Sequence, residues 1–425
     1  MSVFDRIIGY ETVRRELERI CDALTNTEYY RKLGVSSPRG LLLNGSPGVG
    51  KTLMAECLIE ASGRKAFLCR KDRPDGKFVD VIRDVFDKAA RNTPSIVFMD
   101  DMDKYANDDN SHRNSVEFVT VQSCIDAARG LDIFVIATVN EIHNLPDSLI
   151  RPGRFDKVIN VHPPKGKDAA DIVKHYLKNQ NCMDRIDCDS VAVLLNGMSC
   201  AGLETAVNKA GMLAAFERCE KIAMRHLVLG CLDVQHGILP ESIVCGINDD
   251  EALKITYHES GHILVTEFLF PKRVSAACIF KEENASLRGL TISRPVECSS
   301  AETVISDAVC DMGGRAAVRQ KYGTADVGSA WDMDSAYNSI YDITTYSAAS
   351  GFGLTDTESR NCSDSFRFSQ EQVIKSRLEE CSLKAESIIA ANRDLLEATA
   401  QELMRKGLLT APDIQDLIRR CPLNR

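Results

Sequence analysis

The octapeptide at residues 45–52 constrains the fold more than any other feature of this chain. It reads GSPGVGKT, directly follows the apolar run Leu41–Leu43, and precedes a helical pattern. A GxxxxGK[ST] loop between a strand and a helix is the phosphate-binding loop, whose backbone N–H groups close around phosphates. An ordinary glycine-rich turn is the alternative, and the flanking patterns disfavour it. The loop predicts an α/β fold and a nucleotide site formed by Gly45, Ser46, Pro47, Gly48, Val49, Gly50, Lys51 and Thr52.

A second apolar run, Ser95–Met99, ends in the acidic pair Asp100 and Asp101. In such a site Lys51 contacts the β and γ phosphates, and the Thr52 hydroxyl helps to hold Mg2+. Asp100 is placed to support the same Mg2+, and Asp101 lies beside the water that attacks the γ phosphate. An acidic pair at the end of a strand can also be a plain solvated terminus. The phosphate-binding loop earlier in the chain favours the catalytic interpretation of this pair. We therefore expect ATP and Mg2+ as cofactors.

Short apolar runs alternate with helical patterns over residues 1–165, which predicts a parallel, doubly wound sheet. The runs are Leu41–Leu43, Ala66–Cys69, Ser95–Met99, Ile133–Ala137 and Val158–Val161. Residues 166–240 carry apolar residues at helical spacing and predict a small helical lid. Residues 241–425 follow a linker and predict a mainly α-helical domain. Within it we expect one strand at Gly289–Ser293 and one long helix from about Gln370 to Lys406.

Charge and hydropathy exclude two classes of partner. The net charge is -9 and the pI is near 5.5, whereas nucleic-acid binding usually needs a basic face. No apolar run reaches the roughly eighteen residues of a membrane span, and residues 1–14 lack the apolar core of a secretory signal. We therefore expect no nucleic-acid partner, no membrane span in this chain and a cytoplasmic location.

A second motif, HESGH at residues 258–262, lies within Ile255–Leu269, a stretch that reads as a helix. Residues four apart share one helix face, so His258 and His262 can bind one Zn2+ while Glu259 activates the bound water. Catalysis needs a third protein ligand and an open position for water. The downstream candidates are Asp307, Asp311, Asp326, Asp332 and Asp334, and spacing alone does not choose among them.

Residues 134–140 (FVIATVN) and 149–156 (LIRPGRFD) resemble the second region of homology of AAA+ ATPases. The resemblance implies that Asn140 is the sensor of the γ phosphate. It also implies that Arg151 and Arg154 are arginine fingers, which reach a neighbouring subunit's site and neutralise charge in the transition state. Two arginines in an ordinary turn are the alternative. Fingers that act in trans imply a ring, usually a homo-hexamer in this family.

The whole chain resembles the FtsH family of ATP-dependent zinc metalloproteases. The order of the parts carries the resemblance: the ATPase block, the lid, the HESGH helix, the segment GGRAA at residues 313–317 and the C-terminal helices. The implied architecture is an α/β AAA+ ATPase module with a helical lid, followed by a mainly α-helical zinc peptidase domain. The family's third zinc ligand is an aspartate after GGRAA, which implies Asp332, with Asp334 as the alternative.

Two further assignments come from the same resemblance. Ile8 and Gly9 resemble the backbone pocket for adenine. The strand at Gly289–Ser293 resembles the sheet edge beside which family members align an extended polypeptide substrate.

Three positions depart from the family's pattern. Asp101 stands where the family usually has glutamate. The segment Cys69–Val79 lacks the aromatic pore loop, and its closest substitute is Phe78; Ala127–Gly130 replaces a DGF-like stretch that members use between subunits. These departures predict a weakened motor that handles unfolded polypeptides better than stably folded ones.

Three functions remain in competition. The expected one is an ATP-dependent zinc metalloendopeptidase that degrades unfolded or weakly folded polypeptides. The second is a zinc peptidase whose ATPase is mainly an assembly or conformational switch. The third is a non-proteolytic remodelling ATPase with a structural zinc.

Overall fold

The structure, a computed structural model, forms two compact units. One consists of Met1–Lys178 and Asn196–Thr205, the other of Asn179–Leu195 and Ala206–Arg425. The structure describes residues 2–35, 38–71, 78–105, 115–151, 153–178, 180–183, 186–246, 250–281, 287–296, 300–324, 329–346 and 363–425. No helix within these ranges is long and apolar enough to cross a membrane.

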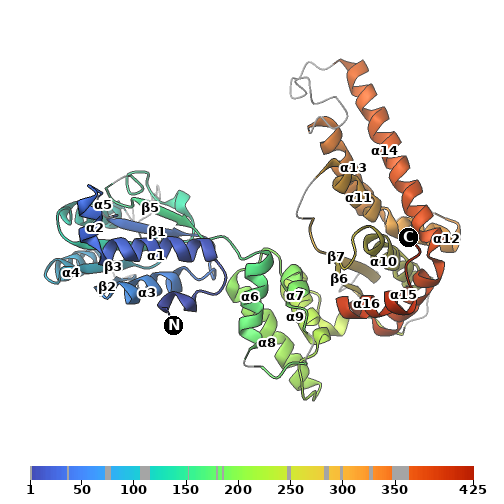
Figure 1. Cartoon of the computed structure of the whole chain (residues 1–425), viewed down its shortest axis with the longest axis horizontal. Helices are drawn as coiled ribbons and strands as arrows, with labels where there is room; N and C mark the ends of the chain where they lie inside the picture. The colour runs from blue at the N-terminus through green and yellow to red at the C-terminus, as the bar shows by residue number, and fades with distance from the viewer. Residues whose placement is uncertain are drawn as a thin grey trace. The chain divides into compact units, whose positions relative to one another are not determined.

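The first unit contains a five-stranded parallel sheet in the order β2-β3-β4-β1-β5 (Figure 1). Its strands are β1 (Gly40–Asn44), β2 (Lys65–Cys69), β3 (Ser95–Met99), β4 (Ile133–Val139) and β5 (Lys157–Asn160). Each of them overlaps an apolar run of the sequence, so the expected α/β sheet is confirmed. β3 and β4 are buried along their whole length, which is why they read as continuous apolar runs.

The helices of this unit cover the sheet (Figure 1). α1 (Glu11–Thr25) packs on α3 (Lys51–Ser62), and α4 (Phe78–Ala90) packs on α5 (Ser115–Ala127) and on strands β2 and β3. The others are α2 (Thr27–Lys32), α6 (Gly166–Leu177) and the 3-10 helices η1 (Val3–Arg6), η2 (Met102–Lys104) and η3 (Ile142–Asn144). The strand order brings the carboxyl ends of β1, β3 and β4 side by side, the usual ligand position in such sheets.

Phe78 begins α4 and lies in the core of this unit. It is 4% exposed, and its ring meets Tyr105 edge to face with 4.8 Å between centroids. The interpretation of Phe78 as a substitute pore aromatic is therefore wrong, because a buried ring cannot grip a substrate chain. Residues 72–77 of the same segment lie outside the described residues.

Helices dominate the region expected to be a lid. They are α6, α7 (Cys188–Leu194), α8 (Cys200–Phe216) and α9 (Met224–His236). The division between the two compact units falls inside this region, since α6 and the start of α8 belong to the first unit. The boundaries expected at residues 165 and 240 stay predictions.

The second unit is built around α10 (Asp250–Leu269), which packs against α12, α15 and β7. Figure 1 shows the long helix α14 beside α11 and α13. The bounds are α11 (Ala301–Asp311), α12 (Gly313–Tyr322), α13 (Ala330–Thr345), α14 (Asp364–Ala391), α15 (Arg393–Lys406) and α16 (Ala411–Arg420), with η4 (Pro240–Ser242) before them. This mainly helical architecture confirms the expected one.

A three-stranded antiparallel sheet in the order β7-β6-β8 accompanies these helices. β7 (Leu287–Ser293) confirms the strand expected at Gly289–Ser293 and lies at the sheet's edge. β6 (Val274–Lys281) and β8 (Leu408–Thr410) were not expected. β6 is buried over its first six residues and so lacks an alternating pattern, and β8 is too short to show one.

The single long helix expected from about Gln370 to Lys406 is wrong. The chain forms α14 and α15, which are separated at the buried residue Asn392. The Asn392 side chain donates to the carbonyl oxygens of Ile388 and Asn424, and its Oδ1 accepts from the backbone N–H of Asn424 at 2.6 Å. These bonds fix the break by joining it to the C-terminal segment.

Candidate metal and nucleotide sites

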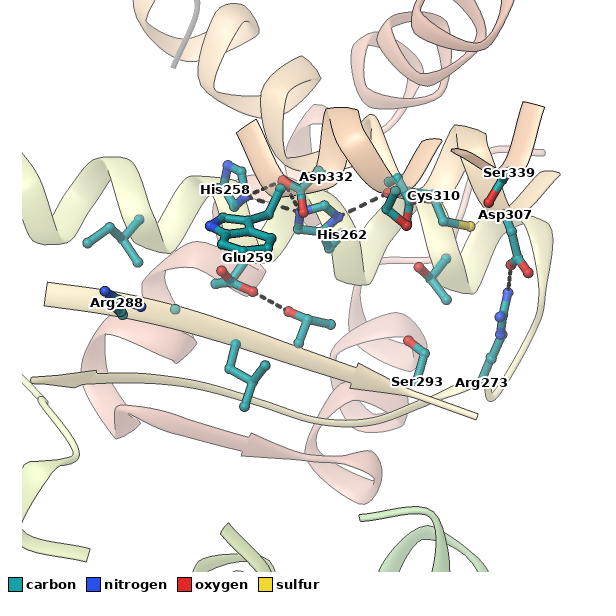
Figure 2. Close-up of a pocket in the computed structure, with 18 of the residues that line it drawn as sticks. His258, Glu259, His262, Arg273, Arg288, Ser293, Asp307, Cys310, Asp332 and Ser339 are labelled. Atoms are coloured by element: carbon teal, nitrogen blue, oxygen red, sulfur yellow. Dashed lines mark hydrogen bonds and ion pairs between the residues drawn. The ribbon is translucent and has the colours of Figure 1, made fainter. Parts of the chain in front are cut away.

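His258, His262 and Asp332 converge in the second unit (Figure 2). The two histidine Nε2 atoms lie 3.1 Å apart, and Asp332 Oδ2 lies 3.1 Å and 3.4 Å from them. Tetrahedral bonds of about 2.0–2.2 Å would place three ligand atoms about 3.3–3.6 Å from one another. The donor set, two imidazoles and one carboxylate, is also the one that suits Zn2+. These three residues therefore fit a zinc ion.

A backbone contact beyond the three donors orients His262. His262 donates from Nδ1 to the carbonyl oxygen of Cys310 at 3.0 Å, which leaves its Nε2 lone pair directed at the site. Burial raises the pKa of Asp332, but the interactions of its carboxylate with His258 and His262 outweigh burial and hold that pKa well below its ordinary value. The site therefore presents an ionised carboxylate to a cation.

Glycines allow the helices around this site to approach closely. A Cβ on Gly261 would lie 2.2 Å from the carbonyl oxygen of Gly313, so α10 and α12 touch there through their backbones. A Cβ on Gly314 would lie 2.6 Å from ring atoms of His258 and His262. The glycines of HESGH and GGRAA are thus the positions at which the two motifs meet.

Glu259 is buried between α10 and β7. Its Oε2 accepts a hydrogen bond from Thr291 Oγ1 at 2.5 Å, and Figure 2 shows its carboxylate directed toward the strand. A cleft of about 820 Å³ opens beside it, lined by the three converging residues, by β7 and by α13. The cleft therefore brings a buried carboxylate, the candidate metal site and an edge strand together.

The other described acids that were candidates for the third ligand do not join the two histidines in a metal-binding group. Asp334 is exposed on α13, and Asp307 forms an ion pair with Arg273. Asp311 lines the cleft, and burial raises its pKa to about 6. Asp326 lies outside the described residues. Among the described candidates, the structure brings Asp332 together with both histidines.

A second group of possible metal ligands, Glu217, Cys219 and His226, does not fit a metal. His226 Nδ1 accepts a hydrogen bond from the backbone N–H of Ala223 at 2.9 Å. The neutral ring must then carry its proton on Nε2, which lies 3.1 Å from Glu217 Oε2 and donates to it. Nε2 thus has no lone pair for a metal, and the group is a helix-capping arrangement.

The phosphate-binding loop borders a cavity of about 580 Å³ in the first unit. Lining residues from η1, α6 and α8 surround the loop, and Ile8 is among them. Gly9 follows Ile8 with a φ of +67°, and a Cβ there would lie 3.1 Å from Asp168. Only glycine suits this turn and its close approach to α6.

Lys51 and Asn140 meet in this cavity. Lys51 Nζ donates to the carbonyl oxygens of Gly45 and Ser46, at 2.6 Å and 3.0 Å, and to Asn140 Oδ1 at 2.9 Å. The backbone N–H of Asn140 donates to Asp103 at 3.0 Å. Burial lowers the pKa of Lys51. The loop lysine and the expected sensor are therefore within reach of one phosphate group.

The two strand-end acids differ in their surroundings. Asp100 is buried, and its Oδ1 accepts from Thr138 at 2.7 Å and from Thr52 at 3.3 Å. Asp101 has a φ of +50° and an ion pair with Lys104 at 2.6 Å. Aspartate tolerates this left-handed backbone better than most residues do. The Thr138 hydroxyl contacts both acids, because it donates to Asp100 Oδ1 and accepts from the Asp101 N–H at 2.8 Å. Sequence reasoning missed this residue.

The two arginines expected to be fingers differ in exposure and in contacts. Arg151 is exposed. The Arg154 side chain is 12% exposed, and its guanidinium donates to both carboxylate oxygens of Asp126 and to the carbonyl oxygen of Ser148. Sequence reasoning noted the unusual Ala127–Gly130 stretch but missed Asp126, the residue just before it.

Comparisons with known proteins divide the chain in the same way as the two sites. Residues 41–163 match the ATPase family associated with various cellular activities (AAA), and residues 246–417 match Peptidase family M41. The ATP-dependent zinc metalloprotease FtsH of Caldicellulosiruptor bescii is 29% identical over 98% of this chain and 72% of its own length. FtsH 2 of a Thermoanaerobacter species is 26% identical over 97% of this chain and 82% of its own length. FtsH of Mycoplasma pneumoniae is 29% identical over 97% of this chain and 61% of its own length.

Proposed function

The chain belongs to the FtsH-type AAA+ zinc metalloproteases, and on that premise we propose how its residues divide the work between peptide cleavage and ATP hydrolysis. It is an ATP-dependent zinc metalloprotease with Zn2+, ATP and Mg2+ as cofactors. Its substrates are polypeptides that are unfolded or weakly folded.

His258, His262 and Asp332 hold the zinc ion in this proposal, and Glu259 is the general base. Zn2+ supplies a Lewis acid and a bound water of lowered pKa. Glu259 accepts a proton from the attacking water at a carboxylate oxygen and returns it to the leaving amine nitrogen. Strand β7 aligns the extended substrate through backbone hydrogen bonds at its outer edge.

The observation that carries the proposal is the convergence of three donors beside Glu259 and an open cleft. A structural zinc is usually enclosed by four protein ligands, whereas three donor groups converge here among the described residues. Three donors leave one coordination position for water, and the cleft gives a substrate access to it. Both features support catalysis and disfavour the remodelling function with a structural zinc.

ATP hydrolysis is assigned to the cavity beside the phosphate-binding loop. Lys51 and Thr52 bind the phosphates and Mg2+, Asp100 supports Mg2+, Asp101 orients the attacking water and Asn140 senses the γ phosphate. The remaining loop residues, Gly45 to Gly50, provide backbone N–H donors. Ile8 and Gly9 contact the adenine through their backbone.

The trans-acting role goes first to Arg151 in a homo-hexameric ring, the assembly typical of this family. Its exposed side chain supports that choice. Arg154 instead orders the turn that presents Arg151, because Asp126 and Ser148 already engage its guanidinium. It could reach a neighbouring phosphate only by exchanging those contacts. The cytoplasmic location expected from the sequence stays a prediction.

Two features predict that the ATPase unfolds stably folded substrates poorly. Phe78 is buried in the core, and Asp101 is one methylene shorter than the family's usual glutamate. Misplacement of a reacting group by about 1 Å costs on the order of a hundredfold in rate. We therefore propose slow ATP turnover and a preference for chains that need little unfolding.

The deciding experiment compares a short peptide, an unstructured polypeptide and a tightly folded reporter, each with ATP, with a non-hydrolysable analogue and without nucleotide. We expect Glu259→Gln to abolish all cleavage while zinc stays bound, and Lys51→Ala to abolish degradation of the unstructured polypeptide. Equal degradation with ATP and with the analogue would instead support the switch function. Cleavage absent from the wild-type enzyme under every condition, with zinc bound, would support remodelling.

A further inference from the structure

Two residues of β7 face the carboxylate of Glu259. Thr291 Oγ1 donates to Glu259 Oε2 at 2.5 Å, and a Cβ on Gly289 would lie 2.2 Å from Glu259 Oε1. Side chains two residues apart point to the same face of a strand, so Gly289 and Thr291 form one surface against α10. Glu259 is 5% exposed, so these contacts with β7 lie in a buried part of the site.

We propose that Thr291 is a positioning residue for Glu259, an inference that rests on the proposed function. A glutamate side chain has several rotatable bonds, and one charge-assisted hydrogen bond to a rigid strand selects among their rotamers. That bond also makes the two carboxylate oxygens unequal. Oε2 is engaged by Thr291, whereas Oε1 lies against Gly289, where a Cβ would collide with it.

The arrangement assigns a separate task to each atom. Oε1 accepts the proton of the attacking water and passes it to the leaving amine nitrogen, while Thr291 keeps its own proton and its bond to Oε2 throughout. Because β7 also aligns the substrate, the same strand sets the position of the base and of the scissile bond. Gly289 is needed for this arrangement, since any side chain there would displace Glu259.

Three variants test the proposal. Thr291→Val keeps the shape of the side chain and removes the hydroxyl, Thr291→Ser keeps the hydroxyl, and Thr344→Val is the matched control. Thr344 is buried on α13, and its hydroxyl has no hydrogen-bond partner among the residues that the structure describes. The control therefore makes the same chemical change without removing a contact.

We expect Thr291→Val to lower kcat for a short peptide by about 10- to 100-fold, the usual cost of losing a supporting contact at a metal site. KM and zinc content should stay close to wild type, Thr291→Ser should recover most of kcat, and Thr344→Val should keep it. In a Glu259→Gln background, Thr291→Val should leave the affinity for a labelled peptide unchanged. This last measurement does not depend on turnover.

Three outcomes would overturn the positioning role. The first is an unchanged kcat in Thr291→Val, and the second is Thr291→Ser as impaired as Thr291→Val, which would indicate a role for shape alone. The third is a raised KM with kcat retained, which would indicate that Thr291 holds the peptide. Loss of the proposed function is distinguishable, because it requires that Glu259→Gln itself stays active.

Discussion

Two parallel hydrogen bonds join Arg154 to Asp126, from Nε to Oδ1 at 3.0 Å and from Nη2 to Oδ2 at 2.7 Å. They connect the last turn of α5 with the turn that precedes β5. The hydrogen bond from Arg154 lowers the pKa of Asp126, so the carboxylate stays ionised at neutral pH. A planar, two-point contact of this kind fixes orientation as well as distance.

Arg154→Ala should therefore destabilise the ATPase unit by about 1–3 kcal/mol, because Asp126 loses two charge-assisted bonds. Asp126→Ala should cost a similar amount. The double variant should cost less than the sum, since the pair is broken only once. Urea unfolding followed by circular dichroism provides the measurement, and Arg151→Ala is the control that should leave stability nearly unchanged. Additive effects would show that the two residues do not stabilise each other.

Arg151→Ala should slow ATP turnover by about a thousandfold or more, with nucleotide binding retained, because an arginine finger acts on transition-state charge. Mixed rings of Arg151→Ala and Lys51→Ala subunits give the geometric test. Some interfaces in such rings pair an intact loop with an intact finger, so activity should partly recover. No recovery in verified mixed rings would place Arg151 outside the neighbouring subunit's site.

The local motifs could be predicted from sequence because their residues are close along the chain. Lys51 follows its strand within one loop, and His258 and His262 are one helical turn apart. Asp126 and Arg154 lie 28 positions apart, and the sequence around either residue does not predict their contact. The same holds for Thr291, whose contact with Glu259 depends on how a strand packs on a helix.

The third metal ligand shows the same limit. Several aspartates follow HESGH, and only the packing of α13 against α11, which itself packs on α10, brings Asp332 to the histidines. The resemblance to a known family supplied this residue, whereas spacing did not. β6 and β8 were missed for a different reason, since burial on both faces or a length of three residues removes the alternation that marks a strand.

Asp332→Ala should lower zinc content, because two histidines alone bind zinc poorly. Asp334→Ala is the matched control. Asp334 lies two residues after Asp332 on α13 and is exposed, so this variant should keep full zinc stoichiometry. Metal analysis of the purified proteins after dialysis provides the comparison. Metal loss in the Asp334 variant with retention in the Asp332 variant would exchange the two assignments.

Asp101→Asn should abolish most ATP turnover while leaving nucleotide binding and stability close to wild type. Asparagine keeps the size of the side chain and tolerates the φ of +50°, so only the charge is lost. Asp101→Glu is the companion variant and keeps an acid at this position. The left-handed backbone there disfavours glutamate by roughly 1–2 kcal/mol. We expect it to lower thermal stability. Unchanged ATP turnover in Asp101→Asn would remove Asp101 from the reaction.

Trp331 should report substrate binding directly. It is the only tryptophan of the chain, it is 84% exposed, and it lines the cleft one position before Asp332. An indole that leaves water for contact with a bound chain changes its emission, so titrating peptide into the inactive Glu259→Gln variant should shift the fluorescence to shorter wavelength and saturate. The dissociation constant should agree with that from the anisotropy of a labelled peptide. Trp331→Phe should remove the signal while the anisotropy change remains. An emission spectrum that stays unchanged when anisotropy shows the cleft to be occupied would place the bound peptide away from Trp331, and with it away from the α13 wall of the cleft.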